Sequence, residues 1–576
     1  MQIKVSDYIA EFLRIQGMTH VFEMAGGMIT HLLDSLYRLG QMDIISVHHE
    51  QAASFAADAY GRCTGKPGVA LATSGPGATN LLTGIASCFF DSSPALFITG
   101  QVNSHEQKGD RNIRQLGFQE TDIIAMAQSV TKKCFRITHA NQVESALKEA
   151  YQCAISDRPG PVLIDIPMNI QREIITISPI QVIEKVLPSI VPFHQQIDAL
   201  FHALENAKKP LLLVGRGVQC AFAKKALLSF VDQVKVPVVT SLLALDVIPY
   251  DHPYRVGMIG SYGNRWANLS IGLADLIIVI GSRLDIRQTG ADVDAFRQHK
   301  TLFHIDCDAG EINNRIKGCI PIVMDSHFFL TYAMTRHLSN RDQERQAWMN
   351  EINQLKNTWP DTLELNNITG INPNDLMHRL SKKSQNIAGF VADVGNHQMW
   401  AAQSLELNAK QFFMTSGGMG AMGFALPAAI SASLVFKKCP VVVIAGDGGF
   451  QLNIQELQTA VRNRLLLKII VLNNQSLGMI RQFQDSYFEG RYQSTYWGYS
   501  APDFSAIAMA YGMETTTISK PHELDEALTW LCDKKDQPVL LQVMIDAKTN
   551  VYPKIAFGRP ITEMEPDAKP MSMEST

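Results

Sequence analysis

Residues 441–450 read Val-Val-Val-Ile-Ala-Gly-Asp-Gly-Gly-Phe, an apolar, β-branched run followed by a glycine turn. Such a run is typical of a strand buried in a parallel sheet. Apolar residues at helical spacing predict a helix over 451–462, and a second buried strand over 466–472 ends at Asn473 and Asn474. The two strands are predicted to be neighbours, which places Asp447 and Asn474 at the edge where open α/β sheets bind ligands.

The groups at this edge are oxygen donors and free amides. A carboxylate and an amide oxygen suit Mg²⁺ or Ca²⁺ better than Zn²⁺. Free amides on a glycine turn that opens a helix suit a diphosphate. On the spacing alone, an ordinary strand-to-helix turn followed by a loop explains the pattern equally well.

The whole chain has the composition of a multidomain globular protein. Its 576 residues are too many for one core,. Strands alternate with helices, which favours doubly wound parallel sheets. Lys and Arg total 51 against 55 Asp and Glu, so charge gives no reason to expect nucleic acid or a membrane as partner,. Nine cysteines without a Cys-x-x-Cys pair, and no signal-peptide core, predict a cytoplasmic protein with reduced thiols,.

The residues around the opening segment resemble those of a known family. Asp447-Gly448 with Asn474 resembles the Mg²⁺–diphosphate motif of thiamine diphosphate enzymes, and Ser476 follows as a further metal ligand. Segments 446–457 and 473–484 are similar to the acetohydroxyacid (acetolactate) synthase branch. The resemblance implies an α/β protein of three doubly wound parallel-sheet domains. These are a pyrimidine-binding (PYR) domain over 1–185, a central FAD-binding-like domain over 190–345, a diphosphate-binding (PP) domain over 371–548 and a tail over 549–576.

Glu50 is the candidate catalytic group, because it stands where a strand over 44–48 meets a small-residue helix. By resemblance it contacts the pyrimidine ring of thiamine diphosphate and promotes deprotonation of C2, a role that requires a carboxylate in a mainly apolar pocket. Taken alone, Glu50 is better explained as a residue that complements a helix N-terminus, an effect of about 0.3–1 kcal/mol. The motif Ser-Gly-Pro-Gly-Ala-Thr-Asn over 74–80 matches the same family and places Pro76 and Asn80 beside the cofactor.

The resemblance also assigns substrate and cofactor contacts. Gly27, Phe118 and Gln119 would face the bound substrate, together with Met479 and Phe483 further along the chain. Met422 would be the wedge that bends the cofactor, although a core methionine before a buried helix fits the local pattern equally well. Other cofactor contacts would be Gly420, Gly448, Gly449 and the second diphosphate loop, which comprises Val394, Gly395, Asn396 and His397. Asn396 stands where the family has Gln.

The middle of the chain carries segments similar to the FAD-contacting parts of acetohydroxyacid synthases. Arginines paired with strand-end carboxylates suit the diphosphate and ribose of a dinucleotide. The predicted contacts are Arg158, Gly281, Arg283, Asp285, Arg287, Asp306 and Asp325. Many relatives with degenerate middle domains bind no flavin, so a middle domain without FAD is the alternative. The resemblance gives FAD a structural role, because carboligation has no net redox step.

Four departures from the family bear on the substrate. Ala25 replaces a proline, Met168 replaces a lysine, and Phe483 replaces a tryptophan at a position that favours 2-ketobutyrate as acceptor. The loop over 102–118 is longer than usual and carries Lys108, Arg111 and Arg114. Such a loop is often only solvated, but it could also receive an anionic acceptor larger than pyruvate.

The resemblance implies a thiamine diphosphate- and Mg²⁺-dependent carboligase. It decarboxylates pyruvate and transfers the two-carbon unit to a second 2-keto acid, giving acetolactate. One alternative is transfer to a ketone such as a nucleotide-linked keto sugar, and another is a catalytically silent regulatory paralogue. A flavin-oxidising relative is less favoured. The family active site lies between two chains, so a homodimer or homotetramer is expected, with a regulatory subunit as a possible partner.

Overall fold

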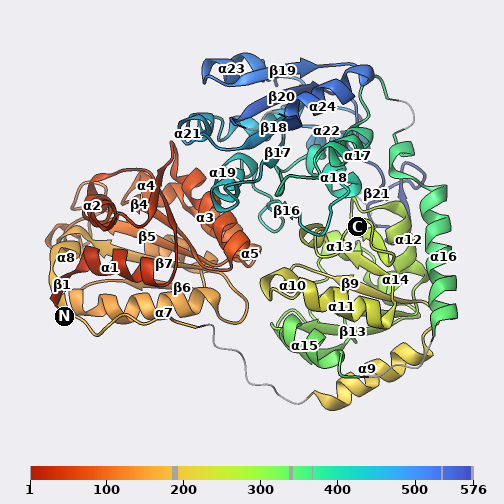
Figure 1. The fold of residues 1–576 in the computed structure, drawn as a ribbon, viewed down its shortest axis with the longest axis horizontal. Coiled ribbons are helices and arrows are strands. Elements are labelled where there is room, and N and C mark those ends of the chain that lie inside the picture. Colours follow the sequence, from red (N-terminus) through yellow and green to blue (C-terminus); the bar gives the residue numbers. More distant parts are fainter. Residues whose placement is uncertain (1, 185–192, 337–340, 366–367, 534–535, 572–576) are drawn as a thin grey trace.

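The computed structural model describes residues 2–184, 193–336, 341–365, 368–533 and 536–571. It contains three six-stranded parallel sheets, each with helices on both faces, in three lobes that follow one another along the chain (Figure 1). The predicted fold class is therefore confirmed. The predicted domain boundaries at 185 and 190 lie outside the described residues and stay a prediction.

The N-terminal lobe is built on a sheet of strand order β3-β2-β4-β5-β7-β6. Its strands are β2 (His20–Glu23), β3 (Asp43–Ser46), β4 (Gly68–Thr73), β5 (Ala95–Gln101), β6 (Lys133–Arg136) and β7 (Pro161–Pro167), and its main helices are α1 (Val5–Ile15), α2 (Thr30–Leu39), α3 (Glu50–Thr64), α4 (Pro76–Asn80), α5 (Leu82–Phe90), α6 (Ile123–Ala127), α7 (Val143–Ile155) and α8 (Met168–Arg172). Two short strands, β1 (Gln2–Lys4) and β8 (Ile174–Thr176), pair separately. Strand β6 was not predicted, because it is a half-exposed edge strand with a cation at each end and no apolar run.

The middle lobe has the strand order β11-β10-β9-β12-β13-β14. Its strands are β9 (Pro210–Val214), β10 (Val238–Thr240), β11 (Arg255–Met258), β12 (Leu276–Ile280), β13 (Thr301–Asp306) and β14 (Ile320–Val323), and its helices are α9 (His194–Asn206), α10 (Gly217–Cys220), α11 (Lys224–Val234), α12 (Arg265–Leu273), α13 (Ile286–Thr289), α14 (Val293–Arg297) and α15 (Ser326–Ala333). Numbered from β9, this is the order 3-2-1-4-5-6 of dinucleotide-binding folds, whose ligands bind at the β9–β12 switch point. Strand β14 was not predicted, because its two exposed residues, Pro321 and Val323, interrupt the apolar pattern. A proline at an exposed position is typical of an edge strand,.

The C-terminal lobe has the order β16-β15-β17-β18-β20-β19. Its strands are β15 (Gly389–Ala392), β16 (Phe412–Met414), β17 (Val441–Gly446), β18 (Leu467–Asn473), β19 (Glu514–Ile518) and β20 (Val539–Met544), and its helices are α17 (Pro373–Lys383), α18 (Asn396–Ser404), α19 (Ala425–Val435), α20 (Asp447–Gln451), α21 (Glu456–Arg462), α22 (Gly478–Tyr487), α23 (Phe504–Ala510) and α24 (Leu524–Asp533). Counted from its own first strand, this sheet repeats the order of the N-terminal lobe. Strands β17 and β18 are buried along their whole length.

The helix predicted over 451–462 is wrong in its first part. The chain becomes helical at Asp447 in α20, leaves the helix after Gln451, and resumes helix in α21. Asn453 explains the break, because its buried side chain donates to the carbonyl of Gly423 and to the side chain of Gln51. An asparagine committed to such bonds competes with helix formation.

The tail after Met544 folds back onto the middle lobe. Strands β21 (Lys554–Ile555) and β22 (Met564–Glu565) pair antiparallel, and the amide of Ile555 donates to the carbonyl of Ser261. Arg265 forms an ion pair with Asp567 at 3.0 Å. The tail is therefore ordered through residue 571, and residues 572–576 lie outside the description.

An ion cluster fastens the segment that joins the middle and C-terminal lobes, which follows α16 (Asp342–Thr358). His378 of α17 places Nδ1 2.8 Å from an oxygen of Glu406 and Nε2 3.0 Å from an oxygen of Asp361. Burial works against the imidazolium, but the hydrogen bonds and attraction from both carboxylates raise the pKa of His378 to about 9. The ring is therefore charged at neutral pH.

We expect His378→Gln to lower the thermal unfolding midpoint at pH 6 but hardly at pH 10. A raised folded-state pKa contributes stability that is complete below the ordinary value near 6.5 and is lost as pH rises through about 9,. The contribution is on the order of 2 kcal/mol. Midpoints of wild type and variant at both pH values measure it, and an equal difference at both would contradict the charged bridge.

Candidate active site

The carboxylate of Asp447 and the side-chain amide of Asn474, which were predicted to bind the metal, lie at the ends of adjacent strands. Gly446 of β17 pairs with Leu472 of β18, so Asp447 and Asn474 leave the sheet side by side, both buried. The amide of Ser476 lies 3.2 Å from an oxygen of each of these two side chains. Burial raises the pKa of Asp447 to about 6. This is a small, hard-oxygen donor set, which fits Mg²⁺.

The predicted second diphosphate loop lies beside this donor set. Gly395 has a φ of +152°, and Asn396 begins α18. The Oδ1 atom of Asn396 and the Nε2 atom of His397 are buried and have no hydrogen-bond partner among the described residues. Burial lowers the pKa of His397 to about 3, so its ring is neutral. A Cβ at Gly478 would lie 2.6 Å from the amide nitrogen of Asn396, so only glycine fits here. Two unpartnered polar atoms beside a glycine cradle fit a diphosphate.

A cavity of about 730 Å³ joins the C-terminal and middle lobes. It is lined by the three predicted metal ligands, by one predicted substrate residue, Met479, and by most of the predicted cofactor residues. The metal ligands are Asp447, Asn474 and Ser476, and the cofactor residues are Val394, Gly395, Asn396, His397, Gly420, Met422, Gly448, Gly449, Arg158, Gly281, Arg283, Asp285, Arg287, Asp306 and Asp325. One continuous space therefore connects the predicted diphosphate site with the predicted flavin site.

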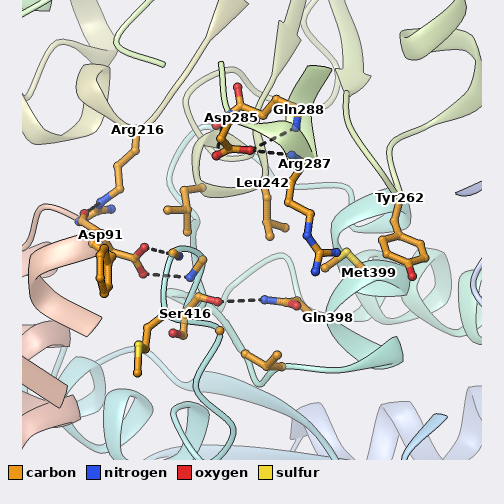
Figure 2. A pocket seen from close by; sticks show the side chains of 18 of the residues that line it. Asp91, Arg216, Leu242, Tyr262, Asp285, Arg287, Gln288, Gln398, Met399 and Ser416 are labelled. Atoms are coloured by element: carbon orange, nitrogen blue, oxygen red, sulfur yellow. Dashed lines mark hydrogen bonds between the residues drawn. The ribbon is translucent and has the colours of Figure 1, made fainter. Parts of the chain in front are cut away.

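The middle-lobe wall of the cavity lies at the β9–β12 switch point. Gly281, after β12, has a φ of +60°, and a Cβ there would lie 2.7 Å from the Cα of Gly217. Asp285 caps α13 by accepting the amides of Arg287 and Gln288, and the Arg287 side chain extends into the cavity (Figure 2). Burial raises the pKa of Asp306 to about 6. Close backbone approach, an arginine and a strand-end carboxylate at a switch point fit a dinucleotide.

Asp91, which the sequence interpretation missed, holds the glycine loop over 416–423 that carries Met422. Its two carboxylate oxygens accept the amides of Gly417 at 2.9 Å and Gly418 at 2.6 Å (Figure 2). Arg62 donates to the same carboxylate at 2.9 Å, and the side chain of Arg216 in the middle lobe donates to the Asp91 carbonyl. Asp91 thus ties one loop to all three lobes.

We expect Asp91→Asn to release this loop. An amide has one acceptor oxygen where the carboxylate has two, so one glycine amide loses its partner at a cost of about 1–3 kcal/mol. Hydrogen exchange over 416–423 should accelerate, and the dissociation constant for thiamine diphosphate should rise on the order of 10-fold. Asp58→Asn is the matched control, because Asp58 pairs with the same Arg62 but not with the loop. Exchange in the loop that is equal in both variants would contradict the assignment.

The remaining predicted residues form a second group in the N-terminal lobe. Glu50, the first residue of α3, is buried, and Asn80 donates to its carboxylate at 2.9 Å. A Cβ at Gly77 would lie 3.1 Å from the other carboxylate oxygen. Pro76 begins the short helix α4 that ends at Asn80.

The predicted substrate-facing residues adjoin this group. Ser74 donates to the carbonyl of Gln119 at 2.8 Å, and a Cβ at Gly75 would lie 2.9 Å from the Gln119 side chain. The space around Gly27 is open, since a Cβ at this residue would meet no atom within 4 Å, and Phe118 is 80% exposed. None of these residues is among those that line the 730 Å³ cavity. Within one chain, the Glu50 group and the Asp447 group are therefore two separate half-sites.

Two further residues near the cavity complete the description. Phe483 does not line the cavity but lies against Tyr487, with ring centroids 4.7 Å apart. Tyr499, which the sequence interpretation also missed, has a buried hydroxyl that a Cβ at Gly448 would approach to 3.4 Å. Burial is the larger influence and raises the pKa of Asp447, while the nearby Tyr499 hydroxyl lowers it. The geometry between the two groups does not meet the criteria for a hydrogen bond.

Comparisons with known proteins agree with this arrangement. Three family models match the chain, and they are described as the N-terminal TPP binding domain (residues 3–126), the central domain (197–332) and the C-terminal TPP binding domain (393–543) of thiamine pyrophosphate enzymes. The chain is 36% identical to the acetolactate synthase isozyme 2 large subunit of Escherichia coli over 97% of its length and 98% of the relative's. It is 36% identical to the acetolactate synthase large subunit of Corynebacterium glutamicum (93% and 86%) and 35% identical to that of Haemophilus influenzae (97% and 97%).

Proposed function

Because this chain belongs to the thiamine pyrophosphate enzymes, and among them to the acetolactate synthase large-subunit family, we propose that it is a thiamine diphosphate-dependent carboligase that makes acetolactate from pyruvate. Thiamine diphosphate and thiamine pyrophosphate are the same compound. Two pyruvates and one proton give one acetolactate and one CO₂. The observation that carries the proposal is the convergence of Asp447, Asn474 and Ser476 at the ends of β17 and β18, inside the cavity that also contains Met422.

The cofactor, when bound, supplies the electron sink for decarboxylation, and the chain supplies placement and charge. Asp447 and Asn474 would hold Mg²⁺, and the glycine turn and Asn396 would hold the diphosphate. Met422 would support the ring system from the loop that Asp91 anchors. Glu50 would hold a proton at the pyrimidine ring from its buried position. Gly27, Phe118 and Gln119 would bind the keto acids. The middle-lobe residues would hold FAD in a structural role.

The separation of the two half-sites supports a homodimer. Since Glu50 does not line the cavity that contains Asp447 within one chain, a second copy is needed to bring the Glu50 group to it. A homotetramer made of two such dimers would contain the same paired half-sites. The relatives are described as large subunits. We therefore propose that a smaller regulatory subunit binds this chain.

The nine thiols are all free, which supports the cytoplasm as the location,. No helix in the described parts of the chain is long and apolar enough to cross a membrane.

The test is a reconstitution of the purified chain with Mg²⁺, FAD and pyruvate, with and without thiamine diphosphate. We expect CO₂ and acetolactate to form only when thiamine diphosphate is present. Formation of acetate with hydrogen peroxide would instead indicate a flavin-dependent oxidase. The absence of CO₂ in a folded, cofactor-bound protein would indicate a silent paralogue.

A further inference from the structure

The loop over 102–118 is a built structure rather than a loose connection. At its start, the Glu106 carboxylate accepts hydrogen bonds from the backbone amide and the side-chain amide of Asn103. Glu120 closes its end, because its two carboxylate oxygens accept the amides of Lys108 at 2.6 Å and Leu116 at 2.9 Å. The side chain of Gln115 donates to the Glu120 carbonyl at 3.0 Å. The loop therefore presents its outer side chains from a fixed backbone.

The outer side chains are mainly cationic. Arg111 and Arg114 are exposed, and the structure gives them no ion pair within the described residues. Among the described residues, the Lys108 ammonium donates to the carbonyl of Ile113 alone. The acids Glu106 and Glu120 are turned inward onto backbone amides, which leaves Asp110 as the exposed acid of the loop. Two arginines three residues apart, with unused donors, are suited to bidentate binding of a phosphate.

The loop leads directly into the Glu50 half-site. Arg114 is four residues before Phe118, so their Cα atoms are at most about 14 Å apart. Gln119 is fixed against Ser74 and Gly75, and a Cβ at Gly77 of the same turn would lie 3.1 Å from Glu50. The two exposed arginines therefore lie within reach of the residues predicted to face the substrate.

We propose that this loop binds a phosphate group of the acceptor, so that the second substrate is a ketone with a phosphate or diphosphate remote from its carbonyl. The inference rests on the proposed carboligase function and specifies its acceptor. In pyruvate the carboxylate adjoins the reacting carbonyl, so it binds beside the residues that surround that carbonyl. An anionic group several bonds from the carbonyl can instead reach the exposed arginines, which lie earlier in the same loop.

The reaction balances without an oxidant. Pyruvate loses CO₂, and its acetyl carbon forms a new bond to the carbonyl carbon of the acceptor. The acceptor's carbonyl oxygen takes up one proton and becomes a tertiary alcohol. The phosphate itself is not transferred. Such an acceptor is either a small keto phosphate or a nucleotide-linked keto sugar, and both present the phosphate chemistry that the arginines recognise.

The experiment compares acceptors on the holoenzyme with pyruvate as donor. Dihydroxyacetone phosphate is paired with uncharged dihydroxyacetone, and a uridine diphosphate-linked 4-keto hexose is tested beside them. We expect one phosphorylated acceptor to be converted with kcat/KM at least about 10-fold above dihydroxyacetone, because charge-assisted hydrogen bonds to the phosphate are stronger than the neutral ones that dihydroxyacetone can make. Preference for the first would indicate a small keto phosphate, and preference for the second would indicate a sugar nucleotide.

A matched pair of variants tests the loop. Arg111→Gln with Arg114→Gln should lower kcat/KM for the phosphorylated acceptor at least 10-fold and leave acetolactate formation from pyruvate alone within about twofold. Arg38→Gln with Lys437→Gln removes the same charge from exposed positions elsewhere and should change neither.

Three results would overturn the inference. Acetolactate formation with no use of either phosphorylated ketone would refute it and leave the proposed function intact. An equal loss of both activities in the loop variant would show a structural role only. The absence of CO₂ with every acceptor would remove the carboligase function and this inference together.

Discussion

Glu50→Gln is expected to slow exchange of the thiamine C2 proton with solvent by on the order of 10²–10⁴-fold. Glu50 is buried at the start of α3 and is held by Asn80 at 2.9 Å. The amide keeps the size and the hydrogen-bonding reach of the side chain but cannot hold the proton. Cofactor affinity should remain nearly unchanged, because the diphosphate contacts lie in the other half-site.

Deuterium incorporation at C2, followed by acid quench and proton NMR, measures this effect directly. Glu11→Gln serves as the control, because Glu11 is a partly buried carboxylate of the same lobe that pairs with Arg14. Exchange at the wild-type rate in a cofactor-saturated Glu50→Gln protein would remove Glu50 from the chemistry.

Asp447→Ala is expected to abolish Mg²⁺-dependent binding of thiamine diphosphate, with a rise in the dissociation constant on the order of 100-fold or more. Loss of an outer partner of a metal site already costs about 10–100-fold, and Asp447 is a direct oxygen donor in our assignment. Its buried carboxylate also accepts the amides of Gly448 and Ser476, which shape the turn.

Titration of the apoprotein with cofactor at fixed Mg²⁺ measures this loss by intrinsic fluorescence. Asp447→Asn is the milder variant, since its single amide oxygen can still accept one of the two backbone amides while the charge on the metal is lost. Asp503→Asn, which exchanges one helix-capping residue for another in the same lobe, should bind normally,. Wild-type affinity in Asp447→Ala would place the metal elsewhere.

Local patterns were sufficient for the parts of the fold that are buried on both faces. Runs such as 441–446 and 276–280 are uniformly apolar and are central strands of their sheets. The adjacency of Asp447 and Asn474 also followed from sequence, because two consecutive buried strands separated by a helix tend to be neighbours in a parallel sheet. The edge strands β6 and β14 lack that signal, since half of each strand faces solvent.

Residues whose role depends on tertiary contact could not be found in this way. Asp91 follows the end of α5 and is unremarkable in sequence, yet it binds a loop more than three hundred residues later in the chain. Asn453 sits in an apparently helical pattern, and only its distant partners Gln51 and Gly423 explain the break. The separation into two half-sites was likewise invisible to spacing and came only from the family resemblance.

The most direct test of the central claim follows [2-¹³C]pyruvate by NMR in a reaction that contains the chain, thiamine diphosphate, Mg²⁺ and FAD. The account predicts that label appears in both the acetyl carbonyl and the tertiary alcohol carbon of acetolactate, with one CO₂ released for each acetolactate formed. Labelled acetaldehyde or acetate as the main product, or no consumption of pyruvate by the cofactor-bound protein, would contradict it.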